Sequence, residues 1–383
     1  MISEIKLNHF RCFKSSSISL SPDINFFYGA NGSGKTSILE ALYMCSSGRS
    51  FKSSNVQSLI SFDEEVFSIT GYDSSRGYTL QIIKNKTNPI SIKVNNTKIT
   101  TSKLIKEFPA TAIHNNTFSF ANAAPDFRRK MVDRSLFVSD IGFSETWFAF
   151  YKTLKQRNSI IKSRNINNID PWNKKFSEEG EVLHKKRLVF FEQSLKEFKD
   201  ILSKLNPCRT TKYLKQTIIE YSPGWNSGLS IYEALLENQS RDLVRKTTTT
   251  GPHKADIKIN INNVEAKQIL SRGEQKILSI LWCCSQHEVL RKIYNINATL
   301  IIDDIKSELD NTTFEIFLDL LKHLNNQIIF LYTLVIFSLS TFTRCLLARC
   351  DTKYDTINRH VGIIVVWYVY GCLKVCEAHP ICR

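Results

Sequence analysis

The chain has 383 residues, of which 42% are hydrophobic, so it is long enough for two or three globular domains with real cores. Its formal net charge of +15 favours a polyanionic partner, either nucleic acid or an anionic membrane, although a basic surface without a dedicated partner would have the same composition. No run of about 18 apolar residues is present, and residues 1–13 lack the apolar core of a signal peptide. These features argue against a membrane-spanning or secreted protein, and we expect a cytoplasmic one.

The predicted elements change in type twice along the chain. They are short strands near 2–7, 18–20 and 25–28, a helix around 38–43, antiparallel hairpins over 66–99, helices from Pro125 onward, a strand over 255–261, a helix over 273–292 and an apolar strand over 299–302. The order is therefore α/β, then helical, then α/β again. It predicts an α/β domain that carries a helical insertion.

A glycine-rich segment follows the strand over 25–28. Its residues Gly29, Asn31, Gly32, Ser33, Gly34, Lys35 and Thr36 fit the pattern G-x-x-x-x-G-K-[ST], and Ser37 comes next. The glycines of such a loop let several backbone N–H groups point at phosphate oxygens, and the following helix adds its positive N-terminal end. Lys35 would bind the β- and γ-phosphates, and Thr36 would give a hydroxyl ligand to Mg²⁺. Because a strand precedes the segment and a helix follows it, an ATP site is favoured over a chance glycine-rich turn.

Two carboxylates end the apolar strand that begins at Thr299. Asp303 could hold Mg²⁺, directly or through water, and Asp304 could orient or deprotonate the attacking water. The alternative is an acidic turn after a core strand. In the nucleotide-site interpretation, Lys35 and Asp304 are the candidate catalytic residues, and Thr36 and Asp303 are the candidate metal ligands.

The segment from Leu270 to Lys276 resembles the signature motif of ABC-type ATPases. Such a motif begins a helix with a serine, a glycine and free N–H groups, and it caps the γ-phosphate that another copy holds. The candidate nucleotide contacts are Ser271, Arg272, Gly273 and Gln275. The alternative is an ordinary helix capped by Ser271 with Glu274. The strand that follows favours the signature, and Asp310 in the next segment matches the D-loop at a dimer seam.

Further segments resemble the RecF family. They are Leu7-Asn-His-Phe-Arg11, Pro125-Asp-Phe-Arg128-Arg129 with Asp133, Tyr151-Lys-Thr-Leu154 with Gln156-Arg157-Asn158, Asp170-Pro171-Trp172, Gly224-Trp225, Gly251-Pro252-His253 and Ser271-Arg272-Gly273 with Gln275-Lys276. Together they cover about residues 1–330. The Q-R-N, G-P-H and S-R-G-x-Q-K segments are much more specific than the phosphate loop alone.

The resemblance implies the fold class and the function. The expected fold is α/β, an ABC-type P-loop ATPase head of the SMC kind, with mixed sheets and an inserted helical lobe. The implied protein binds ATP and Mg²⁺, forms an ATP-dependent homodimer, hydrolyses ATP slowly, and has Arg11 near the nucleotide. It would bind double-stranded DNA near single-strand gaps, and it would work with RecR and RecO to load RecA.

The domain limits follow from the motifs and from the length of the insertion. We expect the N-terminal part of the head over 1–124, the helical lobe over 125–245, the C-terminal part of the head over 246–330, and an atypical tail over 331–383. The tail departs from the family pattern, so we interpret it as the product of a shifted reading frame or a degraded end that impairs activity. Sequencing the gene would reject this interpretation if no frame shift restores the family ending.

Two other functions fit parts of the sequence. One is a scaffold that binds ATP and DNA without useful hydrolysis, which equal rates of DNA dissociation with ATP and with a non-hydrolysable analogue would favour. The other is a transporter ATPase, which the insertion and the lack of a recognisable transporter partner segment disfavour.

Overall fold

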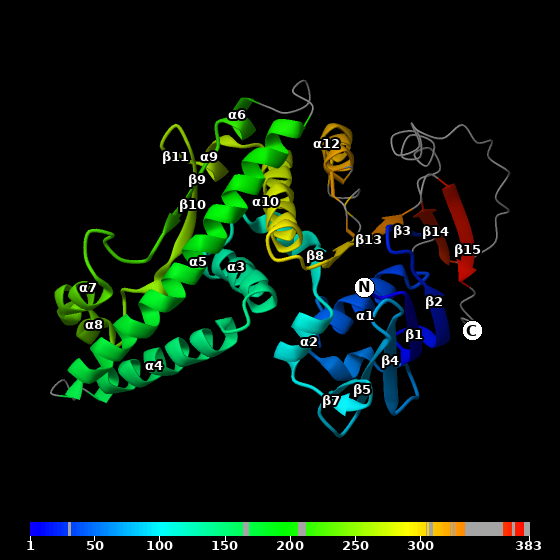
Figure 1. Ribbon diagram of the computed structural model, residues 1–383, viewed down its shortest axis with the longest axis horizontal. Coiled ribbons are helices and arrows are strands. Elements are labelled where there is room, and N and C mark those ends of the chain that lie inside the picture. The colour runs from blue at the N-terminus through cyan, green and yellow to red at the C-terminus, as the bar shows by residue number, and fades with distance from the viewer. Residues whose placement is uncertain are drawn as a thin grey trace. The chain divides into compact units, whose positions relative to one another are not determined.

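The computed structural model describes residues 1–29, 32–163, 168–205, 212–303, 305, 309–321, 323–324 and 326–333, and the backbone of 363–369 and 372–378. These residues form two compact units (Figure 1). The head unit consists of residues 1–118 and 290–383, and the lobe unit consists of residues 119–289. The lobe unit therefore includes residues 246–289, which the motifs assign to the C-terminal part of the head. The four domain ranges expected from the sequence stay a prediction.

The first sheet of the head unit is antiparallel, in the order β2-β1-β4-β5-β6-β7. Its strands are β1 (Glu4–Phe10), β2 (Phe13–Ser19), β4 (Val66–Asp73), β5 (Tyr78–Asn85), β6 (Ser91–Val94) and β7 (Thr97–Lys98). Side chains of β4 and β5 alternate between buried and more exposed positions, as expected for a sheet with one face on the core. The hairpins predicted over residues 66–99 are confirmed.

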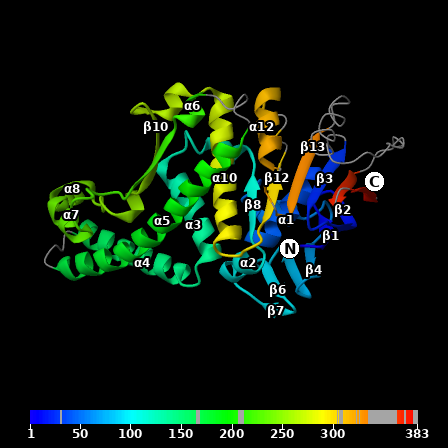
Figure 2. The ribbon, with the colours of Figure 1, turned by 45° about the horizontal axis from the view of Figure 1, so that its top comes forward.

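The second sheet has the order β15-β14-β3-β13-β12-β8. Its strands are β3 (Ile24–Gly29), β8 (Ala110–Ile113), β12 (Thr299–Ile302), β13 (Ile328–Thr333), β14 (Ile363–Val369) and β15 (Cys372–Ala378). Strands β3, β13, β12 and β8 run parallel (Figure 2), whereas β14 runs antiparallel to β3. All four residues of β12 are buried, as is typical of a parallel strand covered on both faces.

Helix α1 (Lys35–Ser47) packs against strands of both sheets. Its apolar residues Ile38, Leu39 and Leu42 are at most 1% exposed and belong to the core of the head unit. The helix ends at Gly48, whose φ of +65° suits glycine because an L side chain rarely adopts it. The other short elements of the head unit are η1 (Val56–Leu59), α2 (Thr101–Glu107), η2 (Asn115–Ser119) and α12 (Asn311–Leu321).

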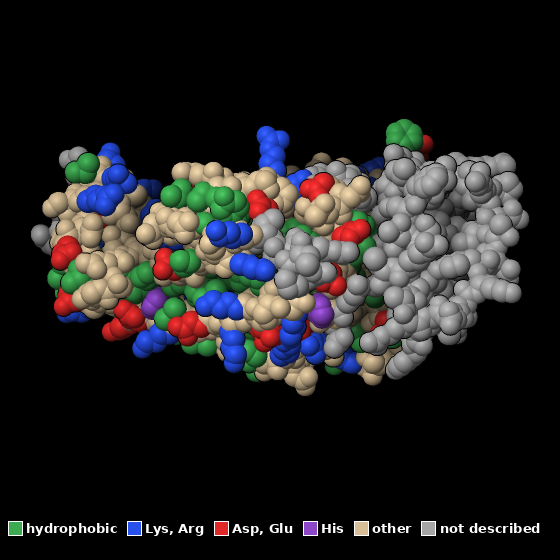
Figure 3. All heavy atoms as spheres, turned by 90° about the horizontal axis from the view of Figure 1, so that it is seen from above, with side chains coloured by type: hydrophobic (Ala, Val, Ile, Leu, Met, Phe, Trp, Pro, Cys, Tyr) green, Lys and Arg blue, Asp and Glu red, His purple; other side chains and the backbone are tan. Residues whose placement is uncertain are grey.

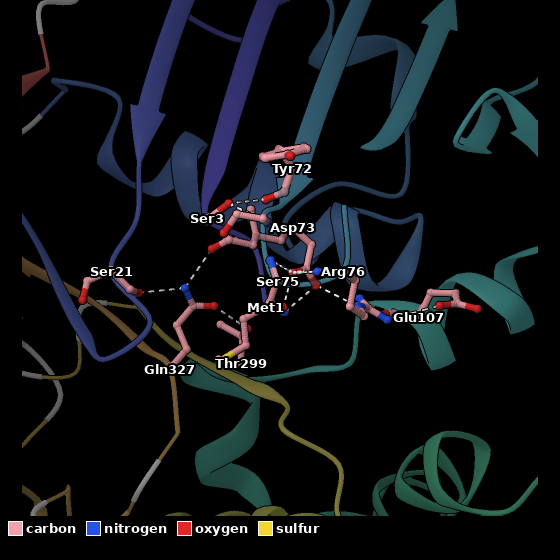
Figure 4. A network of polar contacts seen from close by, with 12 residues as sticks. Met1, Ser3, Ser21, Tyr72, Asp73, Ser75, Arg76, Glu107, Thr299 and Gln327 are labelled. Atoms are coloured by element: carbon pink, nitrogen blue, oxygen red, sulfur yellow. Dashed lines mark hydrogen bonds and ion pairs between the residues drawn. The ribbon is translucent and has the colours of Figure 1, made fainter. Parts of the chain in front are cut away.

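A buried glutamine joins the two sheets near the N-terminus (Figure 4). Gln327, which is 1% exposed, donates hydrogen bonds from Nε2 to the carbonyls of Ile2 and Ser21, both at 2.8 Å. Its Oε1 accepts a bond of 2.8 Å from the Thr299 hydroxyl at the start of β12. Because every polar atom of this side chain has a partner, its burial costs little. The bonds fix the start of β1 to the start of the parallel strands.

The lobe unit consists of helices around a small antiparallel sheet with the order β11-β10-β9. Its elements are α3 (Pro125–Ser139), α4 (Phe143–Ser163), α5 (Asp170–Lys204), α6 (Lys212–Lys215), β9 (Ile218–Ser222), α7 (Ile231–Glu237), α8 (Gln239–Arg245), η4 (Pro252–Lys254), β10 (Asp256–Ile261), β11 (Val264–Glu265), α9 (Ala266–Ile269) and α10 (Arg272–Lys292). The 35-residue helix α5 packs against α3, α4 and α7.

Two buried arginines hold the segment 247–254 inside the lobe unit. Arg157 of α4 is fully buried and donates from Nη1 to Asp242 Oδ2 at 2.8 Å and to the Thr248 hydroxyl at 2.7 Å. Arg187 of α5 makes a bidentate pair with Asp133, with both distances 2.7 Å, and donates to the carbonyl of Pro252 at 2.7 Å. The Q-R-N and G-P-H segments are therefore parts of one buried polar network.

The expected limit at residue 330 falls inside β13, which continues to Thr333. Strands β14 and β15 of the tail lengthen the second sheet on the β3 side. Most other residues of the segment 331–383 lie outside the described part of the chain. The frame-shift interpretation of this segment stays a prediction.

Candidate functional site

The phosphate-loop sequence lies at the carboxyl end of β3, inside the second sheet. Gly32 and Gly34 have φ values of +81° and +92°, which glycine adopts without strain, and α1 begins at Lys35. A β-carbon on Gly34 would lie 2.7 Å from both Cys12 Sγ and an atom of the Phe13 ring. Ala30 and Asn31 lie outside the described residues. The strand, the glycine-rich turn and the helix therefore follow one another as the motif predicts.

A pocket of about 550 Å³ opens at this loop. It is lined by Arg11, Cys12, Gly32, Ser33, Gly34, Lys35, Thr36, Ser37, Lys52, Ser58, Ile60 and Leu331. The structure thus brings Arg11 together with the predicted loop residues, and Lys35 is 5% exposed. Their contact with a nucleotide stays a prediction. Lys52 and Ser58 were not expected, since no motif in the sequence marks them.

Arg11 is held by Glu40, an acidic residue that no sequence motif indicates. Its Nε and Nη2 donate to the two carboxylate oxygens of Glu40, both at 2.9 Å, and its Nη1 donates to the carbonyl of Ser58 at 3.3 Å. Glu40 is on α1 and is 1% exposed. Its position among the apolar residues of this helix was the only signal available.

Asp303 follows β12 directly, and its N–H donates to the carbonyl of Ile113 at 3.0 Å. One strand, β13, separates β12 from β3, and the three strands are parallel. The carboxyl ends of β3 and β12 therefore lie at the same edge of the sheet, where open α/β sheets bind their ligands. Thr36 and Asp303 thus lie along one edge, and a hydroxyl with a carboxylate suits Mg²⁺. Asp304 lies outside the described residues.

A second cavity of the head unit, of about 320 Å³, lies near Arg76, Phe108 and Thr299. The Arg76 guanidinium binds Asp73 Oδ2 at 2.8 Å and Glu107 Oε2 at 3.2 Å (Figure 4). It also stacks on the rings of Tyr78 and Phe108. Two carboxylates and two aromatic rings of the head unit already surround this charge. The pocket at the phosphate loop is the better candidate for an anionic ligand.

The signature segment lies in the lobe unit, at the start of α10. Ser271 and Glu274 form both bonds of a capping box: the Ser271 N–H donates to Glu274 Oε2 at 2.8 Å, and the Glu274 N–H donates to Ser271 Oγ at 3.3 Å. Ser271 and Arg272 are exposed, and Gly273 is half-buried. The capping box that was the alternative interpretation is therefore formed, and Ser271 lies exposed at the start of the helix.

Gln275 is buried, and its side chain is used inside the lobe unit. Its Nε2 donates to the carbonyls of Leu270 at 2.8 Å and Lys267 at 3.2 Å, and its Oε1 accepts a hydrogen bond from Asn122. These bonds hold the turn before α10 in place. Gln275 therefore supports the signature turn here, and its predicted nucleotide contact stays a prediction.

Asp310 caps α12 in the head unit. Its Oδ1 accepts from the Thr313 N–H at 2.8 Å, and its Oδ2 accepts from the Thr313 hydroxyl at 2.9 Å. The bond from the Thr313 backbone is the main cause that lowers the pKa of Asp310. The predicted D-loop aspartate is thus an exposed, ionised helix cap.

The described residues hold neither a candidate membrane span nor a cluster of metal-binding side chains. No helix in that part of the chain is long and apolar enough to cross a membrane. No group of three or more His, Cys, Asp or Glu side chains lies close enough to hold a metal ion among the same residues.

Comparison with known proteins decides the family. Residues 1–341 match the family model described as RecF/RecN/SMC N terminal domain. The DNA replication and repair protein RecF of Shewanella frigidimarina (strain NCIMB 400) is 32% identical over 332 residues, which span 85% of this chain and 90% of the relative. The chain belongs to the RecF family. The RecF protein of Francisella tularensis subsp. holarctica (strain OSU18) is 34% identical over 338 residues, with 85% and 93% of the two chains covered.

Solved structures agree with the fold of this RecF-family chain. A structure described as the recombination mediator protein RecF-ATP in the RecFOR pathway superposes with a TM-score of 0.72 at 24% identity, covering 88% of this chain and 92% of the other. An Smc head bound to the C-winged helix domain of ScpA gives a TM-score of 0.54 at 18% identity, covering 98% and 97%. The predicted fold class, an ABC-type ATPase head of the SMC kind with mixed sheets, is confirmed.

Proposed function

We propose that this RecF-family protein binds ATP and Mg²⁺ in the pocket at the phosphate loop and acts in recombinational repair of DNA. The observation that carries the proposal is the pocket itself, in which two glycines of positive φ, the start of α1 and the buried Lys35 meet. Such a loop presents backbone N–H groups and a cation to phosphate oxygens. A related protein, solved as RecF-ATP, supports the choice of nucleotide.

Different residues of the head unit have different roles in ATP hydrolysis. Lys35 neutralises the β- and γ-phosphates, and Asp304 orients the attacking water and accepts its proton. Water attacks the γ-phosphorus, the bond from that atom to the β–γ bridging oxygen breaks, and ADP and phosphate leave. Thr36 and Asp303 would hold Mg²⁺, which offsets negative charge on the phosphates when it is bound.

A second copy of the chain completes the site in this proposal. The exposed start of α10, with Ser271, Arg272 and Gly273, caps the γ-phosphate held by the other copy. Asp310 lies at the seam between the copies. Because the γ-phosphate would link the two copies, its loss on hydrolysis would release the dimer.

The DNA partner is proposed from family membership and charge. Residues 125–250 contain 23 Lys and Arg against 15 Asp and Glu. On the face drawn in Figure 3, Lys and Arg side chains protrude at several places and are interspersed with acidic ones. Phosphate contacts of this kind position a protein on DNA without reading bases. We infer binding to double-stranded DNA near single-strand gaps, with RecR and RecO as partners in loading RecA.

The test is ATP-dependent assembly of the full-length chain. Analytical ultracentrifugation with Mg²⁺, gapped DNA, and either ATP or no nucleotide should give a dimer only with ATP. Lys35→Ala should stay monomeric, and Lys86→Ala should assemble normally because Lys86 pairs with Glu65 at the surface. Normal ATP-dependent assembly of Lys35→Ala would show that the phosphate site is misassigned.

The same preparation separates a working clamp from a non-hydrolysing scaffold. In the proposed clamp, DNA leaves faster with ATP than with a non-hydrolysable analogue, because hydrolysis removes the γ-phosphate between the copies. Equal rates of DNA dissociation would favour the scaffold.

A further inference from the structure

A buried carboxylate sits on the same helix as the phosphate-loop lysine. Glu40 of α1 is 1% exposed and lies among the apolar residues that pack between the two sheets. A buried carboxylate without partners would be strongly destabilising, so its hydrogen-bond donors define what it does. Among the residues that the structure describes, the donors recorded for it come from two loops beside the pocket.

The first loop contributes Arg11. Its guanidinium, 27% exposed, binds Glu40 through two parallel bonds of 2.9 Å, the bidentate geometry that is both strong and directional. The backbone of Arg11 has a φ of +56°, an uncommon conformation for a residue with a side chain. Its N–H donates to the carbonyl of Leu59 at 2.8 Å, so the same residue also fixes the segment that carries Ser58.

The second loop contributes Ser50. Its hydroxyl donates to Glu40 Oε1 and accepts from the N–H groups of Lys52 at 2.9 Å and Ser53 at 2.8 Å. Glu40 therefore orients the Ser50 hydroxyl, and that hydroxyl fixes the backbone that carries Lys52. Lys52 lines the pocket together with Arg11.

We propose that Glu40 is a positioning residue for the nucleotide site. The loop wall, defined here as the pocket-lining residues Arg11, Cys12, Lys52, Ser58 and Ile60, is held in register with the phosphate loop by this one carboxylate on α1. Arg11 acts mainly as the counter-charge of Glu40. This inference rests on the proposed function, because it assumes that the pocket binds a nucleotide.

The opposite charges of Arg11 and Glu40 predict that the effects of their two substitutions are not additive. Removing Arg11 alone leaves an unpaired buried carboxylate next to a pocket for an anion, whereas removing both charges leaves neither repulsion nor an unpaired ion. A second substitution should therefore repair the first. A direct contact from Arg11 to the nucleotide would give no such repair, because the double variant would lack that contact too.

The experiment measures the dissociation constant of a fluorescent ATP analogue with Mg²⁺. Glu40→Gln should weaken binding about tenfold, and Arg11→Met should weaken it by more than that. The double variant should bind within about threefold of Glu40→Gln alone, and more tightly than Arg11→Met. Glu65→Gln, which breaks only the surface pair with Lys86, is the matched control and should bind normally. Affinity losses that simply add in the double variant would overturn the inference.

A nucleotide-free measurement separates this inference from the proposed function. Amide hydrogen exchange over residues 50–60 should become faster in Glu40→Gln and stay unchanged in Glu65→Gln. Unchanged exchange in Glu40→Gln would reject the positioning role. A wild-type chain that binds no ATP but shows the expected exchange pattern would reject only the proposed function and leave Glu40 as the residue that orders the loop wall.

Discussion

At the scale of single residues, Gly34 combines two requirements that no other amino acid meets. Its φ of +92° is unfavourable for L side chains, and a β-carbon there would lie 2.7 Å from Cys12 Sγ and from the Phe13 ring. Gly77 has a φ of +65° but open space around its β-position. The pair allows backbone strain to be measured with and without a steric clash.

Gly34→Ala should lose nucleotide binding and lower the free energy of unfolding of the head unit by about 2–4 kcal/mol, since strain and overpacking add. Gly77→Ala should cost about 1 kcal/mol and leave nucleotide affinity unchanged. Urea unfolding and titration with an ATP analogue measure both quantities. Equal stability losses in the two variants would contradict the role given to the Cys12 and Phe13 contacts.

His253 is a second residue with a measurable consequence. Its ring packs against Phe150 and Phe176, and its Nε2–H donates to the Thr248 carbonyl at 2.9 Å. Burial lowers the pKa of His253 from 6.5 to about 4. The folded chain therefore binds fewer protons than the unfolded chain between these two values. Stability from the neutral ring is complete above pH 6.5 and is lost as the pH falls towards 4.

His253→Gln tests this linkage. Between pH 6.5 and pH 4, the wild-type chain should lose up to about 3 kcal/mol more unfolding free energy than the variant, because only the wild type must protonate a buried ring. Urea unfolding at several pH values in this window gives the difference. Parallel curves for the two chains would refute it.

At the scale of elements, Arg157 joins three helices of the lobe unit. It bonds to Asn173 of α5 at 2.8 Å and to Asp242 of α8, while it belongs to α4 itself. Asp242 also accepts bonds from the N–H and hydroxyl of Thr249, at 2.8 Å and 2.6 Å. A buried ion pair whose members also bond to neighbouring polar groups gives the helices one preferred register, at the cost of desolvating two charges.

Asp242→Asn should destabilise the lobe unit by about 3–5 kcal/mol, because it leaves the fully buried Arg157 charge without a counter-ion. Asp200→Asn, the same change in an exposed pair with Lys204 on α5, should cost under about 0.5 kcal/mol. Chemical denaturation followed by circular dichroism compares them. A loss below about 1 kcal/mol for Asp242→Asn would mean that the pair contributes little.

Local sequence patterns predicted some of these elements and contacts but not others. Local patterns predicted the strand, loop and helix around Lys35 and the capping box at Ser271, because each depends on residues a few positions apart. The ion pair between Arg11 and Glu40 could not be predicted in this way, since the two residues are 29 positions apart and lie on different elements. Arg157 belongs to the Q-R-N segment that resembles the RecF family. A charged residue on a helix usually faces solvent, so nothing in the sequence indicated that Arg157 is buried.

At the scale of the whole molecule, the net charge of +15 favours binding to DNA phosphates, and the number of phosphates neutralised sets how this binding depends on salt. About six neutralised phosphates would make the logarithm of the association constant fall by about 5 for each tenfold rise in salt. Fluorescence anisotropy with gapped DNA and ATP, from low to moderate KCl, measures this slope. Two unrelated base sequences should give the same affinity. A slope near zero would contradict a phosphate-based interface.

Because α1 packs between two sheets, a ligand bound to this helix should affect the stability of both sheets. A nucleotide bound in the pocket would lie at the first turn of α1, and this helix is part of the core that joins both sheets. At one hundred times its dissociation constant, the ligand would add about 2.7 kcal/mol to the free energy of any opening that releases this helix. Amides of β4 and of β12, on opposite sides of α1, should then slow their exchange together, so the entire head unit would report an occupied site.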